Sequence, residues 1–250
     1  MRKYLRIAVI VTVVLAMFGS CGAIFLFRAA QHEPEFYRQA MTIEPAQQEE
    51  AGDVLEQSVL ELSNETRQPG QWEATFSDEQ INGWLAVDLP PKFASILPPG
   101  VESPRVSIRD GMIHIAARFK DKLVESVVSF SLQVNLTEEP NTVAVTIRKV
   151  RAGVLPVPVR QFLDRISTAA QRGDIQLRWS QDKGDPVAFV TIPSQHERYK
   201  YRQVFVETIE LREGEIYLAG ITGDPRQAPR SDIAQRTLVE LDGTSANIQR

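Results

Sequence analysis

The side chains best suited to catalysis or metal binding are few and lie far apart in this sequence. The histidines stand at His32, His114 and His196, and the single cysteine, Cys21, can form neither an internal disulfide nor a cysteine metal cluster. The chain has no G-x-S-x-G, P-loop, H-E-x-x-H or dinucleotide-binding glycine motif. The sequence therefore predicts no enzyme: no catalytic residues, no metal site and no cofactor.

Ionisable residues near the apolar segments have an ordinary interpretation. His114 alternates with Ile113 and Ile115, which places it on the polar side of a predicted strand, and His196 stands in a charged connector. We interpret the carboxylates that could pair with one another as sheet-surface charges. These carboxylates are Asp121, Glu125, Glu207 and Glu210.

Length and composition are those of an ordinary globular protein. The 250 residues allow one large or two small domains, with 43% hydrophobic and 24% charged residues. The formal net charge is −4, and no basic run follows the first six residues. Because nucleic-acid binding relies on a basic stripe that follows the phosphates, we expect no nucleic-acid partner.

Residues 7–27 form an apolar run of 21 positions without a charge. As a helix, this run would be about 31 Å long, close to the hydrocarbon core of a bilayer at about 30 Å. Arg2, Lys3 and Arg6 precede it, so the positive-inside rule predicts that residues 1–6 are cytoplasmic. We therefore expect a single-pass membrane protein with a transmembrane helix at 7–27 and an extracytoplasmic remainder.

The same N-terminal pattern also fits a signal peptide. The stretch "FGSC" at 18–21 has the small residues and the cysteine of a lipoprotein cleavage site, and ordinary cleavage is a further alternative. Against lipid modification of Cys21, the apolar residues continue to Phe27, where a polar tether would be expected. An uncleaved signal anchor is the favoured interpretation, and both alternatives stay open.

Composition divides the rest of the chain into three segments. Residues 28–71 are acidic and rich in glutamine, and we expect a stalk helix there that docks on the domain. Residues 72–223 carry the periodicities of a folded α+β domain. Residues 224–250 lose periodicity, which predicts a mobile tail.

The stretch "FSDEQINGWL" at 76–85 predicts a well-capped helix with one apolar face. Ser77 can cap the first turn while Gln80 reaches back to the cap. A second, proline-bracketed turn follows and repeats the i, i+3, i+4 spacing of apolar residues. The two apolar faces supply the candidate ligand-binding residues, which are Ile81, Trp84, Leu85, Phe93, Ile96 and Leu97.

Alternating residues predict an antiparallel sheet that is apolar on one face. An Asp110-Gly111 turn joins two alternating runs at 105–119, and "VESVVSFSLQVNL" at 124–136 separates apolar from polar positions. A one-sided sheet needs a cover. The fold class we expect is α+β, a long-stranded antiparallel sheet covered on one face by two or three helices and preceded by one transmembrane helix.

The order of these patterns resembles the YpmS-like family of single-pass bacterial envelope proteins of unknown function. The likeness rests on "FSDEQINGWL", "RVSIRDGMIHI", the long alternating strand and "RAGVLPVPVRQFL", over roughly residues 72–170. Such proteins also look like the tubular lipid-binding domains, in which long curved strands leave an apolar groove for a lipid tail. The resemblance implies a place in the bacterial inner membrane and offers no catalytic residues.

Two non-enzymatic functions fit these expectations. The first is a membrane-anchored extracytoplasmic domain that binds an apolar ligand such as a lipid, or presents a surface to an envelope protein. The alternative is a structural or assembly factor of the envelope with a solid domain and no small ligand. An apolar cavity would favour the first, a filled core with an exposed apolar patch the second, and converging histidine and carboxylate side chains an enzyme.

Overall fold

The computed structural model describes residues 28–223, with gaps at 94–96, 122–124, 158, 173–174, 183 and 193–202. The expected transmembrane segment at 7–27, the cytoplasmic residues 1–6 and the expected tail at 224–250 all lie outside the described residues. Of the described residues, 48% lie in strands and 31% in helices.

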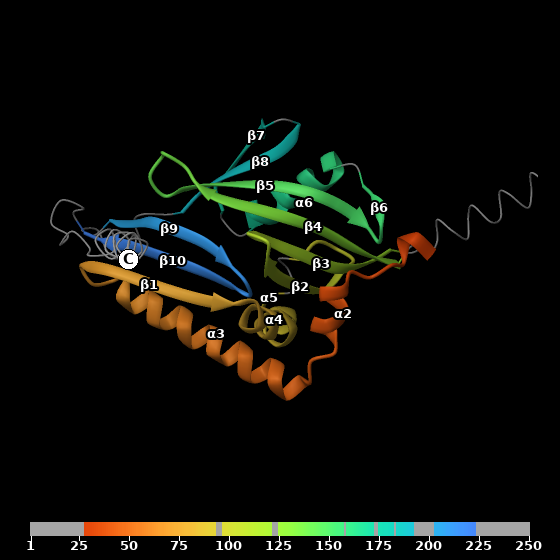
Figure 1. Ribbon diagram of the computed structural model, residues 1–250, viewed down its shortest axis with the longest axis horizontal. Helices are drawn as coiled ribbons and strands as arrows, with labels where there is room; N and C mark the ends of the chain where they lie inside the picture. Colours follow the sequence, from red (N-terminus) through yellow and green to blue (C-terminus); the bar gives the residue numbers. More distant parts are fainter. Residues whose placement is uncertain are drawn as a thin grey trace, which may run out of the picture.

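The described strands form two antiparallel sheets (Figure 1). The smaller sheet has the order β1-β10-β9, and the larger, seven-stranded sheet has the order β2-β3-β4-β5-β8-β7 with β6 paired to β5. The strands are β1 (Gly70–Ser77), β2 (Val101–Arg109), β3 (Met112–Lys120), β4 (Glu125–Leu136), β5 (Thr142–Ala152), β6 (Leu155–Pro156), β7 (Leu177–Asp182), β8 (Asp185–Thr191), β9 (Val204–Arg212) and β10 (Glu215–Thr222). The helices are α2 (Glu35–Met41), α3 (Pro45–Glu65), α4 (Asp78–Val87), α5 (Leu89–Phe93) and α6 (Val159–Arg172).

The predicted hairpin and the predicted helix start are both confirmed. Asp110 and Gly111 have φ angles of 53° and 65° and join β2 to β3, as a tight hairpin turn requires. At the start of α4, the Gln80 amide N–H donates to the Ser77 hydroxyl at 3.1 Å. The Ser77 amide N–H donates in return to the Gln80 side-chain oxygen at 3.0 Å, which completes the capping box.

Two glycines allow α3 and α4 to cross in close contact. A Cβ atom on Gly83 would lie 2.4 Å from the Gln48 carbonyl oxygen and 2.6 Å from the Gly52 amide nitrogen. The glycine at position 52 likewise presents its backbone to Gly83. The acidic helix that we expected as a stalk is therefore packed against the domain.

Polar side chains also close the edge of the larger sheet and join the two sheets. The side chains of Asp78 and Asn82 on α4 form hydrogen bonds with the backbone of β2, the outermost strand of the larger sheet. In the β4–β5 turn, the Asn141 side chain donates to the Val204 carbonyl at 2.6 Å and accepts from the Val206 amide at 2.8 Å. The edge strand β9 of the smaller sheet is thereby fixed to the larger one.

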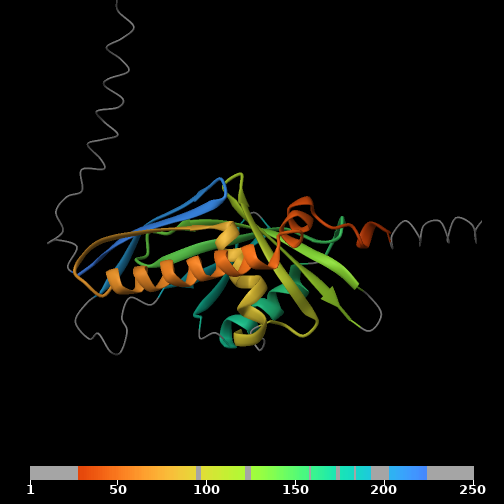
Figure 2. The ribbon, with the colours of Figure 1, turned by 90° about the horizontal axis from the view of Figure 1, so that it is seen from below.

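The two faces of the seven-stranded sheet carry different helices. Figure 2 shows α2 on one side of this sheet and α5 and α6 on the other. On the α2 side, Tyr37 packs against Ala116 and Val127, and these three residues form a buried cluster. On the other side, the Trp179 indole N–H donates to the Ser167 hydroxyl at 2.7 Å and ties α6 to β7.

The expected fold class is wrong, because it placed every helix on one face of a single sheet. Strand dominates, a second sheet is present, and α2 covers the face that the alternation had marked as polar. That face can accept a helix because small side chains, Ala116, Ser129 and Ser131, stand side by side on β3 and β4. None of the helices in the described part of the chain has the length and apolar character needed to cross a membrane.

Strand β1 was not predicted from the sequence. Its residues Trp72, Ala74 and Phe76 alternate with polar ones, and Trp72 and Phe76 are buried. This alternation is the signal that sequence reasoning missed. It is easily overlooked because β1 is one short segment between two helices, and because its partner strand β10 lies about 145 residues further along the chain.

Candidate functional site: an apolar sheet face and an acidic cavity

The candidate ligand-binding residues are only partly brought together. The rings of Trp84 and Phe93 are in contact, with centroids 5.6 Å apart and planes tilted by 39°, and Phe93 is 40% exposed. The side chains of Ile81, Leu85 and Leu97 are half-buried, while Ile96 lies outside the described residues. A cavity of about 1040 Å³ and another of about 550 Å³ are lined by other residues.

The apolar face of the seven-stranded sheet is buried at its flanks. Val106 and Ile108 on β2 are 9% and 1% exposed, where α4 closes the sheet edge. On the opposite flank, Ile147 of β5 and Ala188 of β8 are 3% and 4% exposed. Both flanks of this face are therefore closed.

The centre of the same face is more open than its flanks. Large apolar side chains on the middle strands β3 and β4 are only half-buried. The strand register places them on one face, opposite the α2 side. We call these residues the central apolar strip: Ile113, Ile115, Phe119, Phe130, Leu132 and Val134.

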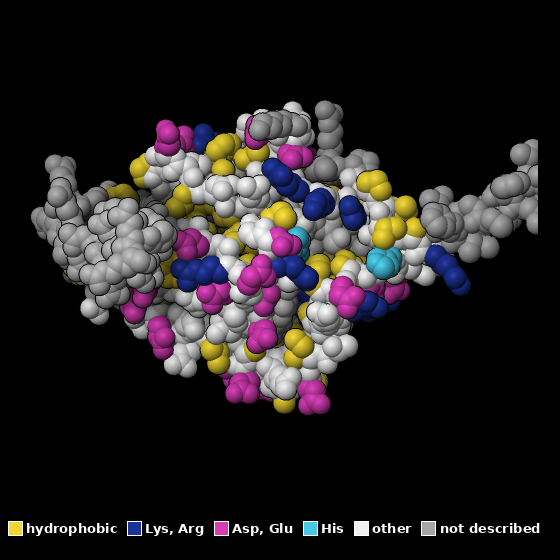
Figure 3. All heavy atoms as spheres, in the orientation of Figure 1, with side chains coloured by type: hydrophobic (Ala, Val, Ile, Leu, Met, Phe, Trp, Pro, Cys, Tyr) yellow, Lys and Arg dark blue, Asp and Glu magenta, His cyan; other side chains and the backbone are white. Residues whose placement is uncertain are grey.

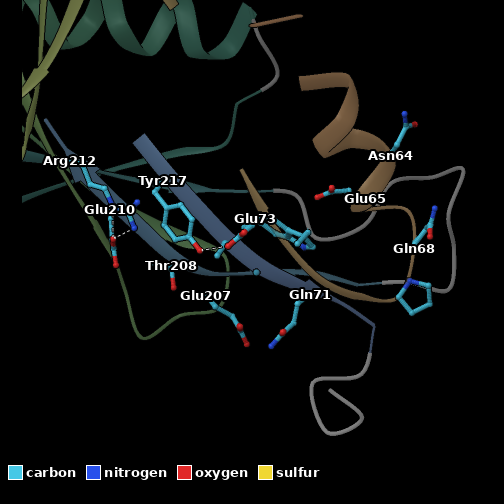
Figure 4. A pocket seen from close by; sticks show the side chains of 14 residues that line it. Asn64, Glu65, Gln68, Gln71, Glu73, Glu207, Thr208, Glu210, Arg212 and Tyr217 are labelled. Atoms are coloured by element: carbon cyan, nitrogen blue, oxygen red, sulfur yellow. Dashed lines mark hydrogen bonds and ion pairs between the residues drawn. The ribbon is translucent and has the colours of Figure 1, made fainter. Parts of the chain in front are cut away.

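The larger cavity lies on the smaller sheet, between the end of α3 and strands β1, β9 and β10 (Figure 4). Four carboxylates line it, from Glu65, Glu73, Glu207 and Glu210, with Arg212 as the single basic residue. We call it the acidic cavity. Its residues come from two regions far apart in sequence, 64–73 and 207–220, so spacing alone gave no signal for it beyond the pairing noted for Glu207 and Glu210.

Hydrogen bonds organise the floor of the acidic cavity. The Tyr217 hydroxyl donates to the Glu73 carboxylate at 2.8 Å, which raises the pKa of Tyr217 because a phenolate would face that carboxylate. Arg212 donates to Glu210 at 2.8 Å, and its guanidinium carbon stands 4.3 Å from the centre of the Tyr217 ring. The pKa of Arg212 is raised by its bond to Glu210.

Trp72, one of the residues that line this cavity, carries an unpartnered donor that is buried from solvent. Trp72 is 7% exposed, and its indole nitrogen has no hydrogen-bond partner among the described residues. The ring lies directly over Gly220, where a Cβ atom would come within 2.3 Å of it. The indole is therefore fixed in place, with its N–H unsatisfied.

The histidines and the remaining candidate carboxylates do not come together in one site. His114 lies on β3 and shares a 2.9 Å hydrogen bond with Ser131, and burial followed by the nearby charge of Arg109 lowers the pKa of His114. His32 is exposed, and His196 lies outside the described residues.

The carboxylate of Glu125 lies 3.8 Å from the guanidinium of Arg118. Within the residues described, no group of three potential metal ligands is found.

Charge is unevenly distributed over the molecule. Figure 3 shows lysine and arginine side chains gathered over β4 and β5, and acidic side chains spread over α3 and the smaller sheet. Arg148 on β5 has a partner in Asp185 at 3.6 Å.

Comparison with known proteins adds no relative from which a role can be transferred. The chain matches no protein-family model, no curated protein and no solved structure. The likeness to the YpmS-like family stays a prediction.

Proposed function

We propose that this chain is a non-enzymatic binding domain that holds an apolar, lipid-like ligand against the central apolar strip. The observation that carries the proposal is the contrast in burial across one sheet face. Ile108 and Ile147 at the flanks are nearly sealed, while Phe130 and Leu132 between them remain half-buried. A face that served only as core would be most buried at its centre.

The energetics favour an apolar occupant. Burying apolar surface contributes about 25 cal/mol for each Å² removed from water. An acyl chain laid along β3 and β4 would remove both its own surface and that of the strip from water. The half-exposed Phe93 beside Trp84 would extend this apolar surface at the rim. The expected location, on the extracytoplasmic side of a bacterial cell membrane, supplies lipid and is part of the proposal.

The first test fills the strip without adding charge. Ala117 on β3 is half-buried and shares the face of Ile115, whereas Ala144 on β5 is half-buried on the opposite face. Full-length wild type, Ala117→Leu and Ala144→Leu are purified from an envelope fraction and examined by native mass spectrometry. Co-purifying lipid is then identified, and binding of a fluorescent C16 fatty acid is titrated.

The expected result is a stoichiometric lipid on the wild type and on Ala144→Leu, and its loss from Ala117→Leu. Equal lipid content in the two variants would contradict a site on the central apolar strip. A wild-type chain that carries no lipid and does not bind the fatty acid would overturn the proposal.

A second candidate function, an assembly factor that binds an envelope protein, is favoured by exposed apolar residues on α3. Val54, Val59 and Leu60 on this helix are 42%, 48% and 64% exposed. Exposed apolar residues on a long helix are a common form of partner surface. A photo-crosslinking amino acid at Val59 of the full chain, in its own membrane, would give one discrete crosslinked protein if this candidate is correct. The same amino acid at Asn135, an exposed position of β4, would give none.

A further inference from the structure

We infer that the end of the seven-stranded sheet beside residues 28–31 is a docking surface for anionic phospholipid headgroups. This inference rests on the proposed location at a bacterial cell membrane, with residues 7–27 across the bilayer, and is independent of the central apolar strip. Two features of the described residues carry it. One is the attachment of residues 29 and 30 to the sheet, and the other is the set of basic side chains beside that attachment.

Residues 29 and 30 are held on the end of the sheet through their backbone. The Val154 amide N–H donates to the Ala29 carbonyl at 2.9 Å, and the Ser126 hydroxyl donates to the Ala30 carbonyl. Gly153 has a φ of 59°, and a Cβ atom there would lie 2.2 Å from the Ala29 carbonyl oxygen, so this approach requires a glycine. The chain is thereby fixed where β5 ends and β4 begins.

The link between this attachment and the apolar run is too short to act as a flexible tether. The run ends at residue 27, and two residues of extended chain reach at most about 7 Å to Ala29. With residues 7–27 across the bilayer, this end of the sheet therefore lies at the headgroups. Figure 1 shows the described chain starting at the end of the molecule near β6, whereas β1 starts at the opposite end.

Basic side chains without ion-pair partners stand next to the attachment. Arg148, Lys149 and Arg151 are all exposed and belong to the last five residues of β5. Figure 3 shows lysine and arginine side chains gathered over this part of the sheet. Arg148 lies 3.6 Å from Asp185, but Lys149 and Arg151 have no ion-pair partner among the residues that the structure describes. Their charge is available to an anionic partner.

A membrane surface suits these residues better than a soluble anion does. The two cavities of the molecule described above are lined by other residues. Basic residues held at a bilayer surface attract anionic lipids, and each one strengthens the attachment. Val154 is 46% exposed beside Ala29 and adds an apolar contact that a lipid surface can bury. Because the whole chain carries a net charge of −4, these basic residues would also orient the domain on an anionic membrane.

The test identifies the lipids that touch each end of the molecule. A photo-crosslinking amino acid is placed in the full-length chain at Val154, or at Gln68, an exposed residue just before β1. Each protein is reconstituted in nanodiscs with equal amounts of phosphatidylglycerol and phosphatidylcholine, and mass spectrometry identifies the crosslinked lipid. Lys149→Gln and Arg151→Gln each remove one positive charge. The matched control is Arg178→Gln, at an exposed position of β7 whose side chain contacts Glu139 in the β4–β5 turn.

The expected result is crosslinking of Val154 to phosphatidylglycerol in preference to phosphatidylcholine, and no lipid crosslink at Gln68. Lys149→Gln and Arg151→Gln should each lower this preference by up to about fivefold, because each removes one basic residue from an anionic surface. Arg178→Gln should leave the preference unchanged.

Three results would overturn the inference. Equal crosslinking of the two lipids at Val154 would show that headgroup charge is not recognised. Lipid crosslinks at Gln68 as strong as those at Val154 would show that this end is not the docking surface. An effect of Arg178→Gln equal to that of Lys149→Gln would assign the preference to net charge alone.

The same experiment separates this surface from the proposed lipid site. Ala117→Leu, which fills the central apolar strip, should leave the Val154 crosslinks unchanged, so loss of the strip-bound lipid and loss of headgroup contact are different outcomes. A full-length chain that does not stay in the nanodisc would overturn the membrane location and this surface together.

Discussion

The side-chain amide of Asn82 occupies both hydrogen-bonding groups of the Val106 backbone. Its nitrogen donates to the Val106 carbonyl at 2.8 Å, and its oxygen accepts from the Val106 amide at 2.8 Å. One helical turn earlier, Asp78 accepts from the Ile108 amide at 3.0 Å. The helix α4 therefore takes the place of a neighbouring strand along the edge of β2, which would otherwise be open to pairing with another chain.

Replacing Asn82 by alanine should destabilise the protein strongly. Asn82→Ala leaves a buried N–H and a buried carbonyl without partners, and we expect a loss of about 2–4 kcal/mol in the free energy of unfolding. Chemical denaturation followed by circular dichroism measures it. Asn135→Ala, at an exposed position of β4, should change stability by less than about 0.5 kcal/mol. Equal effects of the two substitutions would argue against the edge-closing role.

A methyl group at the crossing of α3 and α4 should separate the helices. Gly83→Ala places a Cβ atom 2.4 Å from the Gln48 carbonyl oxygen, and we expect a loss of about 2–3 kcal/mol despite the better helix propensity of alanine. At Gly52 the nearest atoms to such a Cβ would be Asp88 Oδ2 at 3.1 Å and Gly83 C at 3.2 Å. Gly52→Ala should therefore cost less. A thermal midpoint for Gly83→Ala at or above that of Gly52→Ala would contradict the packing described.

Stability should fall as the solution becomes mildly acidic, and His114 should account for part of the fall. Its pKa is lowered by burial and by Arg109, with Lys149 acting in the same direction and Asp110 against them. The unfolded chain then binds more protons than the folded one, so the free energy of unfolding decreases as pH falls through about 6.5.

Denaturation midpoints of the wild type and His114→Gln at about pH 7 and about pH 5 test this contribution. The variant should lose less stability than the wild type over this interval. His32→Gln, at an exposed site, should behave as the wild type does. An unchanged pH dependence in His114→Gln would show that the histidine is not responsible.

The pKa of Tyr217 should depend on Glu73. Glu73→Gln removes the carboxylate that holds the phenol neutral, so the pKa of Tyr217 should drop toward the ordinary value of about 10. Titration of tyrosine labelled with ¹³C at Cζ measures it. Since the folded pKa is raised, the stabilisation it gives the wild type is present below about pH 10 and is lost as pH rises through the folded pKa.

The matched control for this titration is Glu207→Gln, which removes a carboxylate from the same cavity without touching the Tyr217 hydroxyl bond. A Tyr217 pKa that moves equally in both variants would assign the effect to the general charge of the cavity instead of to the single bond with Glu73.

Features that depend on neighbours along the chain were readable from the sequence. The capping box of Ser77 and Gln80 and the Asp110-Gly111 turn involve residues within three positions of each other, so their types alone specify the local geometry. Period-two alternation likewise identified the long strands β4 and β5, because successive side chains of a strand point to opposite faces.

Alternation could not say what covers each face. On β4, Ser131 reads as a solvent-facing residue, yet it is 5% exposed beneath the α2 side of the sheet. The partner of a sheet face is a segment elsewhere in the chain, and its choice follows from shape as well as polarity. This is why the expected one-sided cover was wrong.

The sequence by itself determined the local elements, the strand alternation and the scarcity of residues suited to catalysis. Only the tertiary structure decided that β1 pairs with β10, that Asn82 closes the edge of β2, and that four carboxylates from α3, β1 and β9 line one cavity. The physical reason is that local periodicity specifies which side of an element is apolar but contains no information on register or on long-range partners. Those are settled when the whole chain buries its apolar surface and satisfies its backbone hydrogen bonds together.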